Sequence, residues 1–591
     1  MRRGGGVLLV GALLAACAAT SETSTGPSGS GAGPGTGGDA SGSGGGITVG
    51  AGGGLVGAGG GCGAVCSTDL HAVVDCNGNV VEQCTGLEGC DATTGTCANA
   101  CDAAVNNKQA VGCEYYATFM DQLNTSACFA VFVANTWDTP VHIDVERGGT
   151  ALPVASFTYV PQGSGPSLSY DAYDATAGLA PGEVAILFLG GPQGTPSQGN
   201  PVCPFASAVP SGAMIQGSGV GQSFRITTDV PVVSYQINPY GGGSAAVTGA
   251  SLLLPTSVWD TNYVGIHAYE AGPHPASMNI VAAEDGTQVT MVPTNAVVGG
   301  SGVPSGPANT PLTFTLNRGQ HAQLTQDISL SGSVIQADKP IGFMAGARCS
   351  FVPSGVYACD HLEQMVPPVQ ALGSEYVGVM YRPRSGEPAV WRIMGTVDGT
   401  TLSYTPDVGG PTTLSRGQVV EFSTGTPFVV KSQDEDHPFV LLAHMSGGST
   451  NGMNGNGDAD SVLSTPPAQY MSRYVFFADP TYPETNLVVV RAKDGGIFHD
   501  VALDCAGPLG GWQPVGDYEW TRVDLSTSDF QGVNGCSTGR REMTSEGRFG
   551  LWVWGWGTPA TSTFTSYVSY GYPAGMLVQP INEVVVPPIP K

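Results

Sequence analysis

The feature that most constrains the fold is a fixed order of short motifs that recurs along the chain. The motifs are Pro-x7-Tyr-Val, Asp-Gly-Thr, Leu-x-x-Gly-Gln and an Asp-x-Pro turn before a hydrophobic run. One copy consists of Pro255, Tyr263-Val264, Asp285-Gly286-Thr287, Pro293, Leu316, Gly319-Gln320 and Asp338-Lys339-Pro340. The next consists of Pro368, Tyr376-Val377, Asp398-Gly399-Thr400, Pro406, Leu414, Gly417-Gln418 and Asp436-His437-Pro438. Such self-similarity is typical of tandem modules.

Fainter copies flank these two. The earlier one contains Leu179-Ala180-Pro181-Gly182 and Asp229-Val230-Pro231, and the later one contains Pro466, Tyr474-Val475, Asp494-Gly495 and Ser545-Glu546-Gly547. We therefore predict four repeats of about 100 residues. Their approximate bounds are 114–250, 251–362, 363–462 and 463–585.

The motifs indicate β-structure. Asp-Gly provides the positive φ values of a tight hairpin turn between the strands expected at 278–283 and 287–292. Alternating hydrophobic residues in 419–422 and 428–431 are typical of half-buried strands. About seven such segments in about 100 residues match the size of one β-sandwich, so we predict four sandwich-like repeats. A β-propeller, with two blades in each repeat, is the alternative.

Composition agrees with an all-β chain and excludes one class of partner. The 591 residues are enough for several domains. With 88 Gly and 43 Pro, turns should be frequent and long helices rare. The formal charge of -26 would repel a nucleic-acid backbone, so DNA and RNA are excluded as partners.

The first residues predict export. Met1-Arg2-Arg3 and the apolar run at 7–16 have the charged head and short hydrophobic stretch of a secretory signal. Leu14-Ala15-Ala16-Cys17 resembles the lipobox of bacterial lipoproteins, in which the cysteine is acylated, so residues 1–17 form the signal and Cys17 is the predicted palmitate-carrying site. Ala18, rather than Asp, follows the cysteine, and we expect the outer membrane or cell surface. An ordinary signal peptide is the alternative.

Residues 18–61 are almost wholly Gly, Ser, Thr and Ala. This composition cannot bury enough apolar surface to offset chain entropy, so we expect a disordered tether. A flexible chain of this length has a mean reach on the order of 35 Å.

The other 14 cysteines are an even number in an exported chain, which favours disulfides. Eight form a predicted cysteine-rich module at 62–113, namely Cys62, Cys66, Cys76, Cys84, Cys90, Cys97, Cys101 and Cys113. The remaining six are Cys128, Cys203, Cys349, Cys359, Cys505 and Cys536. Cys349–Cys359 and Cys505–Cys536 have the spacing of local loop closures, while zinc at the Cys62–Cys66 and Cys97–Cys101 spacings is the alternative.

Three groups of residues are candidate sites with structural alternatives. Asp360, His361 and Glu363 could act as acid, base and metal ligands, but Cys359 beside them favours a disulfide-bonded connector. Asn454, Asn456, Asp458 and Asp460 offer alternating oxygen ligands for calcium, without the glycine and glutamate of an EF-hand loop. Trp552, Trp554 and Trp556 alternate on one face of a strand, which we interpret as core-facing rather than as a ligand platform.

No catalytic motif is present. The sequence lacks H-E-x-x-H, G-x-S-x-G and the phosphate-binding G-x-x-x-x-G-K-[ST]. We therefore predict a protein that is not an enzyme and carries no cofactor or metal. A secreted glycan hydrolase remains the alternative, because its paired carboxylates need no fixed spacing.

The region from 112 to 585 resembles the N-terminal domain family named after the IgG-Fc-binding protein of mucus. The resemblance is strongest from Ala337-Asp338-Lys339-Pro340-Ile341 through Cys349 to Cys359-Asp360-His361-Leu362-Glu363-Gln364 and Pro367, with Ser569-Tyr570-Gly571-Tyr572-Pro573-Ala574-Gly575-Met576 as a further match. It implies an extracellular, non-catalytic binding or adhesion module for a protein or glycan ligand. A structural protein of the cell envelope is the alternative.

Overall fold

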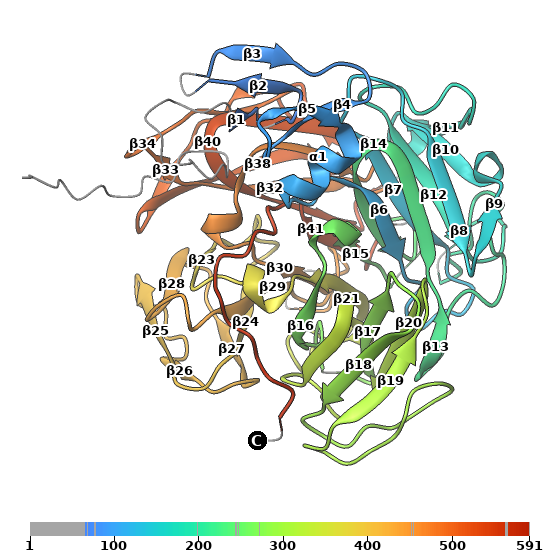
Figure 1. The fold of residues 1–591 in the computed structure, drawn as a ribbon, viewed down its shortest axis with the longest axis vertical. Helices are drawn as coiled ribbons and strands as arrows, with labels where there is room; N and C mark the ends of the chain where they lie inside the picture. The colour runs from blue at the N-terminus through green and yellow to red at the C-terminus, as the bar shows by residue number, and fades with distance from the viewer. Residues whose placement is uncertain are drawn as a thin grey trace, which may run out of the picture. The chain divides into compact units, whose positions relative to one another are not determined.

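Strands dominate the structure, a computed structural model that describes residues 65–589 except 68, 76, 77, 198, 243, 244, 246, 271, 451, 453 and 562–564 (Figure 1). The predicted all-β class is confirmed. Within this range the α-helix α1 (Ala100–Asn107) is accompanied by short 3-10 turns at Val154–Ser156, Gly165–Ser167, Thr256–Val258, Val369–Ala371 and Pro467–Gln469. Cys17, the signal, the tether, Cys62 and Cys76 lie outside the described residues.

The first described part is the cysteine-rich module. It contains helix α1 and five short strands, β1 (Val65–Cys66), β2 (Ala72–Val74), β3 (Val80–Gln83), β4 (Glu88–Asp91) and β5 (Thr96–Asn99). Strands β1, β2 and β3 form one small sheet and β4 and β5 a second. Asn99 caps α1 through its side-chain oxygen, which accepts from the N–H groups of Cys101 and Asp102.

The next two groups of strands follow one another along the chain. Module 1 contains β6 (Gly112–Ala117), β7 (Phe129–Asn135), β8 (Ile143–Arg147), β9 (Thr150–Leu152), β10 (Thr158–Gln162), β11 (Ser169–Ala172), β12 (Val184–Gly190), β14 (Phe224–Asn238) and β15 (Gly249–Leu252). Module 2 contains β16 (Asp260–Val264), β17 (Ala276–Ala282), β18 (Thr287–Val292), β19 (Leu312–Leu316), β20 (Gln320–Gln326), β21 (Val334–Ser350) and β22 (Asp360–Val366). Strand β13 (Gly219–Gln222) leaves module 1 and pairs with β20, joining the two modules.

Two further groups complete the set. Module 3 contains β23 (Glu375–Gly378), β24 (Val390–Gly395), β25 (Thr400–Thr405), β26 (Thr413–Leu414), β27 (Val419–Ser423), β28 (Phe428–Ser432), β29 (Phe439–Met445) and β30 (Asp460–Leu463). Module 4 contains β31 (Met471–Ala478), β32 (Glu484–Arg491), β33 (Lys493–Asp494), β34 (Ile497–Phe498), β35 (Val501–Leu503), β36 (Gly507–Pro508), β37 (Gln513–Val515), β38 (Tyr518–Thr527), β39 (Gln531–Gly532), β40 (Gly539–Trp556) and β41 (Ser569–Pro573).

One long bent strand organises modules 1, 2 and 4. In module 2 the first half of β21 pairs with β16 and β18, whereas its second half pairs with β17 and β22. Strands β14 and β40 divide their partners in the same way, and module 3 uses two separate strands, β28 and β29. Each module therefore consists of two half-sheets, in agreement with the sandwich-like prediction.

In modules 2 and 3 the Asp-x-Pro and Tyr-Val motifs meet at this bend. The proline there cannot donate a ladder hydrogen bond, so the pairing changes at that point. Directly after the bend of every module, one carbonyl accepts from a buried tyrosine, which in modules 2, 3 and 4 is the tyrosine of the Tyr-Val motif. The pairs are Tyr115 to Val232 (2.6 Å), Tyr263 to Ile341 (2.7 Å), Tyr376 to Phe439 (2.7 Å) and Tyr474 to Phe549 (2.6 Å). Each buried hydroxyl thus fixes one half-sheet against the other.

The remaining motifs are turns closed by their own side chains. Gln320 Oε1 accepts from the N–H of Asn317 (2.8 Å), and Gln418 Oε1 accepts from that of Ser415 (3.0 Å). The glycine before each glutamine has a φ of +76° or +71°, a conformation that side chains with a Cβ rarely adopt. The motif spacing is therefore set by turn geometry.

The four modules meet along a closed cycle of their last strands. Strand β15 contacts β22, β22 contacts β30, β30 contacts β41, and β41 contacts β15. Gln364 of β22 joins the other three, since its Nε2 donates to the carbonyls of Ala250 (2.9 Å) and Gly571 (3.3 Å) and its Oε1 accepts from Leu463 N–H (3.2 Å). We call β15, β22, β30 and β41 the central ring.

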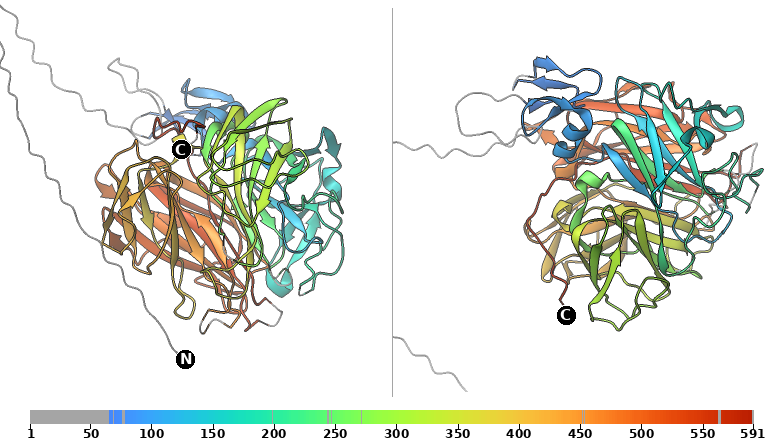
Figure 2. Two further views of the ribbon diagram at one scale, coloured as in Figure 1. Left: turned by 90° about the horizontal axis from the view of Figure 1, so that it is seen from below. Right: turned by 45° about the vertical axis from the view of Figure 1, so that its right-hand side comes forward.

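A segment at 576–586, here called the strap, touches all four modules (Figures 1 and 2). The carbonyl of Met576 accepts from Ala110 N–H (2.8 Å), just before module 1. Other strap residues bond to Gln469 before module 4, to Gln370 before module 3 and to Asn262 in module 2. The strap therefore holds one end of the central ring closed.

Candidate functional site

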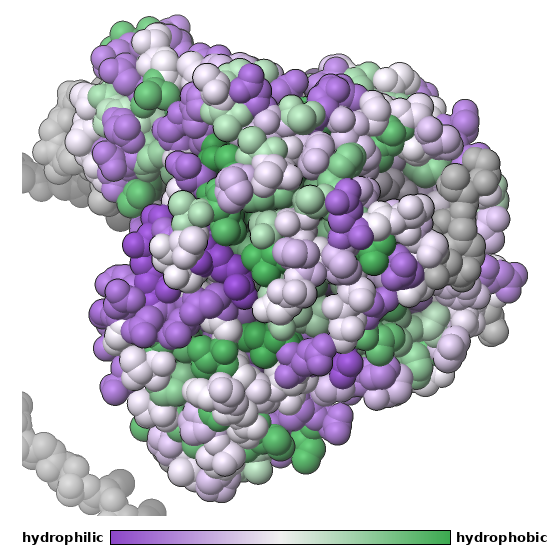
Figure 3. Space-filling view, turned by 90° about the vertical axis from the view of Figure 1, so that its right-hand side faces the viewer, coloured by the Kyte–Doolittle hydropathy of each residue, from purple (hydrophilic) through white to green (hydrophobic). Residues whose placement is uncertain are grey.

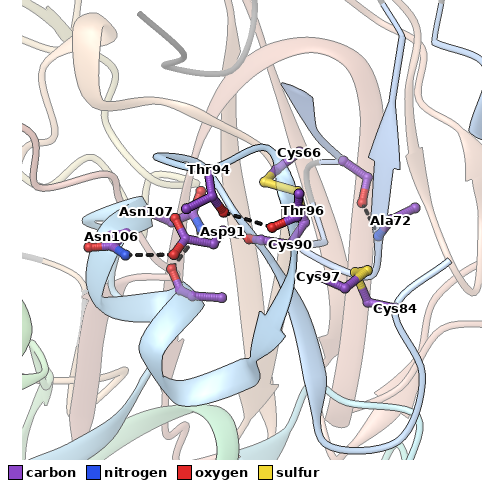
Figure 4. Close-up of a disulfide and its surroundings, with 12 residues drawn as sticks. Cys66, Ala72, Cys84, Cys90, Asp91, Thr94, Thr96, Cys97, Asn106 and Asn107 are labelled. Atoms are coloured by element: carbon purple, nitrogen blue, oxygen red, sulfur yellow. Dashed lines mark hydrogen bonds between the residues drawn. A yellow bond between two sulfur atoms is a disulfide. The ribbon is translucent and has the colours of Figure 1, made fainter. Parts of the chain in front are cut away.

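The described cysteines of the first module are all disulfide-bonded. The pairs are Cys66–Cys90 and Cys84–Cys97, both shown in Figure 4, and Cys101–Cys113. These sulfurs cannot ligate zinc while bonded to one another. The last pair links helix α1 to strand β6. The cysteine-rich module is therefore joined to module 1 by two covalent links, the polypeptide backbone and this disulfide.

The six cysteines of the β-region form three more disulfides. Cys128–Cys203 lies in module 1, Cys349–Cys359 closes the β21–β22 loop, and Cys505–Cys536 lies in module 4. The last two are the local closures expected from their spacing. The first spans 75 residues, a separation from which no pairing could be deduced.

His361 and Glu363 are sealed inside the protein. Both side chains have no exposed surface, and His361 Nε2 lies 3.5 Å from Glu363 Oε2. Gln236 Nε2 donates to the same glutamate oxygen (2.8 Å). Burial raises the pKa of Glu363, although His361 and Gln236 partly oppose that effect. Because solvent does not reach the pair, it holds β22 against β14 rather than facing a substrate.

Asp360, Asp458 and Asp460 form a second buried acidic group. All three are at most 2% exposed. Burial raises the pKa of Asp360, and the charges of Asp458 and Asp460 raise it further. The pKa of Asp458 rises to about 6 by burial, although the N–H groups of Gly448 and Ala459 donate to its carboxylate. Burial therefore disfavours the charged form of all three carboxyls.

The four oxygen residues considered for calcium lie in different surroundings. Asn454 is exposed, whereas Asp458 and Asp460 are buried. Arg384 Nη1 donates to the backbone carbonyls of Asn456 (3.1 Å) and Asp458 (3.4 Å), which holds the loop in place. In the part of the chain that the structure describes, no group of three or more His, Cys, Asp or Glu could hold a metal ion.

The tryptophan stripe is part of the core. Trp552, Trp554 and Trp556 are 6%, 1% and 0% exposed. Tyr381 of module 3 packs 4.7 Å from Trp554 between ring centroids, and the Arg382 guanidinium lies 4.9 Å from the centroid of Trp556. The stripe therefore joins module 4 to module 3 and is not accessible as a platform.

A cavity of about 560 Å³, lined by both charged and apolar residues, lies where modules 3 and 4 meet. Its walls include Glu375, Glu435, Lys493, Tyr518 and Arg548, and its floor includes Pro466. This volume is within the range of small-ligand sites.

Two contacts order one wall of this cavity. Tyr518 O–H donates to Glu375 Oε1 (2.9 Å), and Lys431 Nζ lies 3.0 Å from the same oxygen. Burial and the Glu375 charge raise the pKa of Tyr518, so it stays a neutral donor. No sequence signal indicated this site, because Glu375 and Tyr518 are separated by 143 positions.

One face of the described body shows no broad apolar area. Figure 3 looks onto modules 1 and 2, where small hydrophobic areas alternate with hydrophilic ones. Among the residues described, no helix is long and apolar enough to cross a bilayer.

The motifs and the geometry agree with comparison to known proteins. Residues 249–555, just over half of the chain, match the family model described as IgGFc binding protein, and the chain belongs to that family. Over 231 residues, or 38% of this chain, it is 25% identical to the IgGFc-binding protein of Homo sapiens. That match covers 4% of the human protein's length. No solved structure matches the chain.

Proposed function

We propose that this chain is an exported, non-catalytic binding protein that is displayed by a lipid anchor and recognises an extracellular protein. The observation that carries the proposal is the contrast between sealed and open polar groups. His361, Glu363 and Asp360 have no exposed surface. The cavity between modules 3 and 4, by contrast, opens toward solvent and presents charged and hydroxyl groups. A rigid body with buried chemistry and open polar surfaces suits recognition.

The same proposal accounts for the first residues. Acylated Cys17 would hold the chain at the outer membrane or cell surface, because several acyl chains anchor a protein firmly. The tether at 18–61 would keep the body on the order of 35 Å from the lipid head groups. We also propose that each of the four modules corresponds to one sequence repeat.

Two alternative functions make different predictions. As a structural envelope protein, the chain would be needed for envelope integrity but not for attachment to cells or surfaces. As a glycan hydrolase, it would use the carboxylates of Glu375, Glu435 or Asp517 in the cavity. Glu375 is already engaged by Lys431 and Tyr518, an arrangement that suits fixed binding geometry rather than proton transfer.

Binding measurements on the mature chain test the proposal. Residues 18–591 are secreted into an oxidising compartment and applied to purified human IgG Fc, fibronectin and collagen, and to a glycan array. We expect saturable binding to a protein and no release of sugar from the array. Failure to bind any protein on this panel or on intact cell surfaces would exclude the proposal, and glycan cleavage abolished by Glu375→Gln would favour the hydrolase.

The cysteine-rich module must be retained in this experiment. A fragment beginning at residue 112 would leave Cys113 without Cys101, its disulfide partner. It would also remove Ala110, whose N–H donates to the strap.

A further inference from the structure

Every strand of the central ring begins at a loop and leads toward the strap. Strands β15, β22 and β30 lead to the 3-10 turns at Thr256–Val258, Val369–Ala371 and Pro467–Gln469, and β41 leads to the strap itself. The loops that precede these strands therefore lie together at the opposite end of the ring. We call their described residues the rim, which spans 239–248, 351–359, 446–459 and 557–568.

Hydrogen bonds connect the rim loops of different modules. The links are Gly447 N–H to Val352 O (2.6 Å), Tyr567 N–H to Gly455 O (3.1 Å) and Ser569 N–H, directly after the fourth loop, to Thr248 Oγ1 (3.0 Å). They join module 3 to 2, module 4 to 3, and module 4 to 1. Residues more than 300 positions apart thus form one surface.

The rim sequences carry almost no charge. The 37 described residues of the rim include one Asp, Glu, Lys or Arg, which is Asp458, although 12% of the chain is charged. Asp458 is 2% exposed, so its carboxylate does not reach the surface. On a protein with a formal charge of -26, the rim is therefore an uncharged surface that suits an uncharged partner surface.

Tyr357 is an exposed aromatic group on this surface. It is 74% exposed, and its loop is closed by the Cys349–Cys359 disulfide. The Phe351 ring lies 5.9 Å from the Tyr357 ring, and the Tyr357 backbone carbonyl accepts from Ser449 N–H (3.3 Å). Tyrosine offers a large contact area at a low entropy cost on binding, because its side chain has only two torsion angles.

Other exposed side chains of the rim are small and neutral. Ser354, Ser449 and Asn454 are exposed and offer hydroxyl and amide groups. Tyrosine surrounded by Ser, Gly and Asn is the composition with which antibody loops contact protein antigens. These groups make hydrogen bonds without the desolvation cost of a charge.

We propose that the rim is the ligand-binding surface of this chain, and that its partner is a folded extracellular protein with an uncharged epitope. The inference rests on the proposed binding function. Tyr357 is the aromatic anchor, and the exposed side chains of Ser354, Ser449 and Asn454 supply hydrogen bonds. Contact with the partner is hydrophobic and hydrogen-bonded, so salt has little effect on affinity.

The position of the rim agrees with display on a surface. Helix α1 and the cysteine-rich module pack at the strap end, where Val578 N–H donates to the carbonyl of Lys108 (2.8 Å). Figure 2 shows that this module and the C end lie at the same end of the body. The described chain enters the body from that end, at Val65. A body tethered through its first residues would therefore direct the rim away from the membrane.

The test compares rim variants with a control on the protein of the panel that binds the mature chain most tightly. Tyr357→Ser removes the anchor, and Ser354→Glu places a charge on the exposed loop. Val298→Ser is the control, because Val298 is 64% exposed in the same module but lies outside the rim. We expect each rim variant to weaken binding at least about tenfold, the control to bind like wild type, and 0.5 M NaCl to change wild-type affinity by less than about threefold.

Three outcomes would overturn the proposal. If wild type binds the protein and both rim variants bind it equally well, the rim is not the binding surface, while the proposed binding function stands. If wild type binds only glycans on the array, the assigned class of partner is wrong. If wild type binds no protein at all, both the rim and the proposed function fail. Unchanged melting temperatures and intact disulfides show that the variants are folded.

Discussion

Asp458→Asn should stabilise the protein above pH 6 and have little effect near pH 4. The pKa of this carboxyl is about 6 in the folded protein, against an ordinary value of 3.8 for aspartate, because burial disfavours its charged form. A raised folded pKa means that the stabilising contribution is fully present below about pH 4 and is lost as pH rises through 6. Two pKa units correspond to about 3 kcal/mol. Because asparagine has no charged form, Asp458→Asn removes this energetic cost at pH values above 6.

The substitution keeps the contacts that the carboxylate makes. Asp458 Oδ1 accepts from the N–H groups of Gly448 (2.9 Å) and Ala459 (2.9 Å), and an amide oxygen can accept both. Urea denaturation of wild type and variant at pH 4, 5, 6, 7 and 8 measures the difference. The exposed Asp407 also accepts a backbone N–H (3.0 Å, from Gly409), so Asp407→Asn is the control. A difference in stability that does not grow between pH 4 and pH 8 would refute the reasoning.

Three further predictions concern the modules and the anchor. Tyr376→Phe removes the hydroxyl that donates to the Phe439 carbonyl and should cost about 1–3 kcal/mol in urea denaturation. Replacing Cys349 and Cys359 together by Ser opens a ten-residue closure and should lower stability by about 2–3 kcal/mol. Cys17→Ser should abolish palmitate labelling and move the protein from the membrane to the soluble fraction.

Each of these has a result that would contradict it. Tyr376→Phe with the stability of wild type would mean that the hydroxyl does not fix the half-sheets, and exposed Tyr357→Phe is its control. If reduced wild-type protein unfolds at the same urea concentration as oxidised protein, the disulfides do not stabilise the fold and the expected loss of about 2–3 kcal/mol is wrong. Wild-type cells that incorporate no palmitate into the protein would show that it is not lipid-anchored through Cys17.

The sequence predicted local structure well because the motifs act locally. Asp-Gly and Gly-Gln turns are closed by side chains within a few positions, as Gln320 and Asn317 show. Alternation of hydrophobic residues was therefore enough to predict half-buried strands and a sandwich-like module. Trp552 was interpreted as core-facing on the same grounds, and its 6% exposure agrees.

The arrangement of the modules could not be predicted, because it depends on contacts between distant residues. Gln364 joins β22 to Gly571, which is 207 positions away. A contact between residues this far apart leaves no periodic pattern of hydrophobic residues in the sequence. The cavity and the rim could not be predicted from the sequence either, because the residues of each come from separate loops that contain none of the repeated motifs. The buried state of Asp458 is also a tertiary effect, as its surroundings in sequence are Gly and Asn.

The strap imposes an order in time on folding. Its residues follow module 4 in the sequence, yet they bond to Gln370 and Asn262 in modules 3 and 2. Modules 2 and 3 share a hydrophobic core that includes Val586 of the strap, so this core cannot be complete until residue 586 has emerged. A chain halted within module 4 would therefore lack the strap side of that core. The strap thus distinguishes completed from interrupted chains.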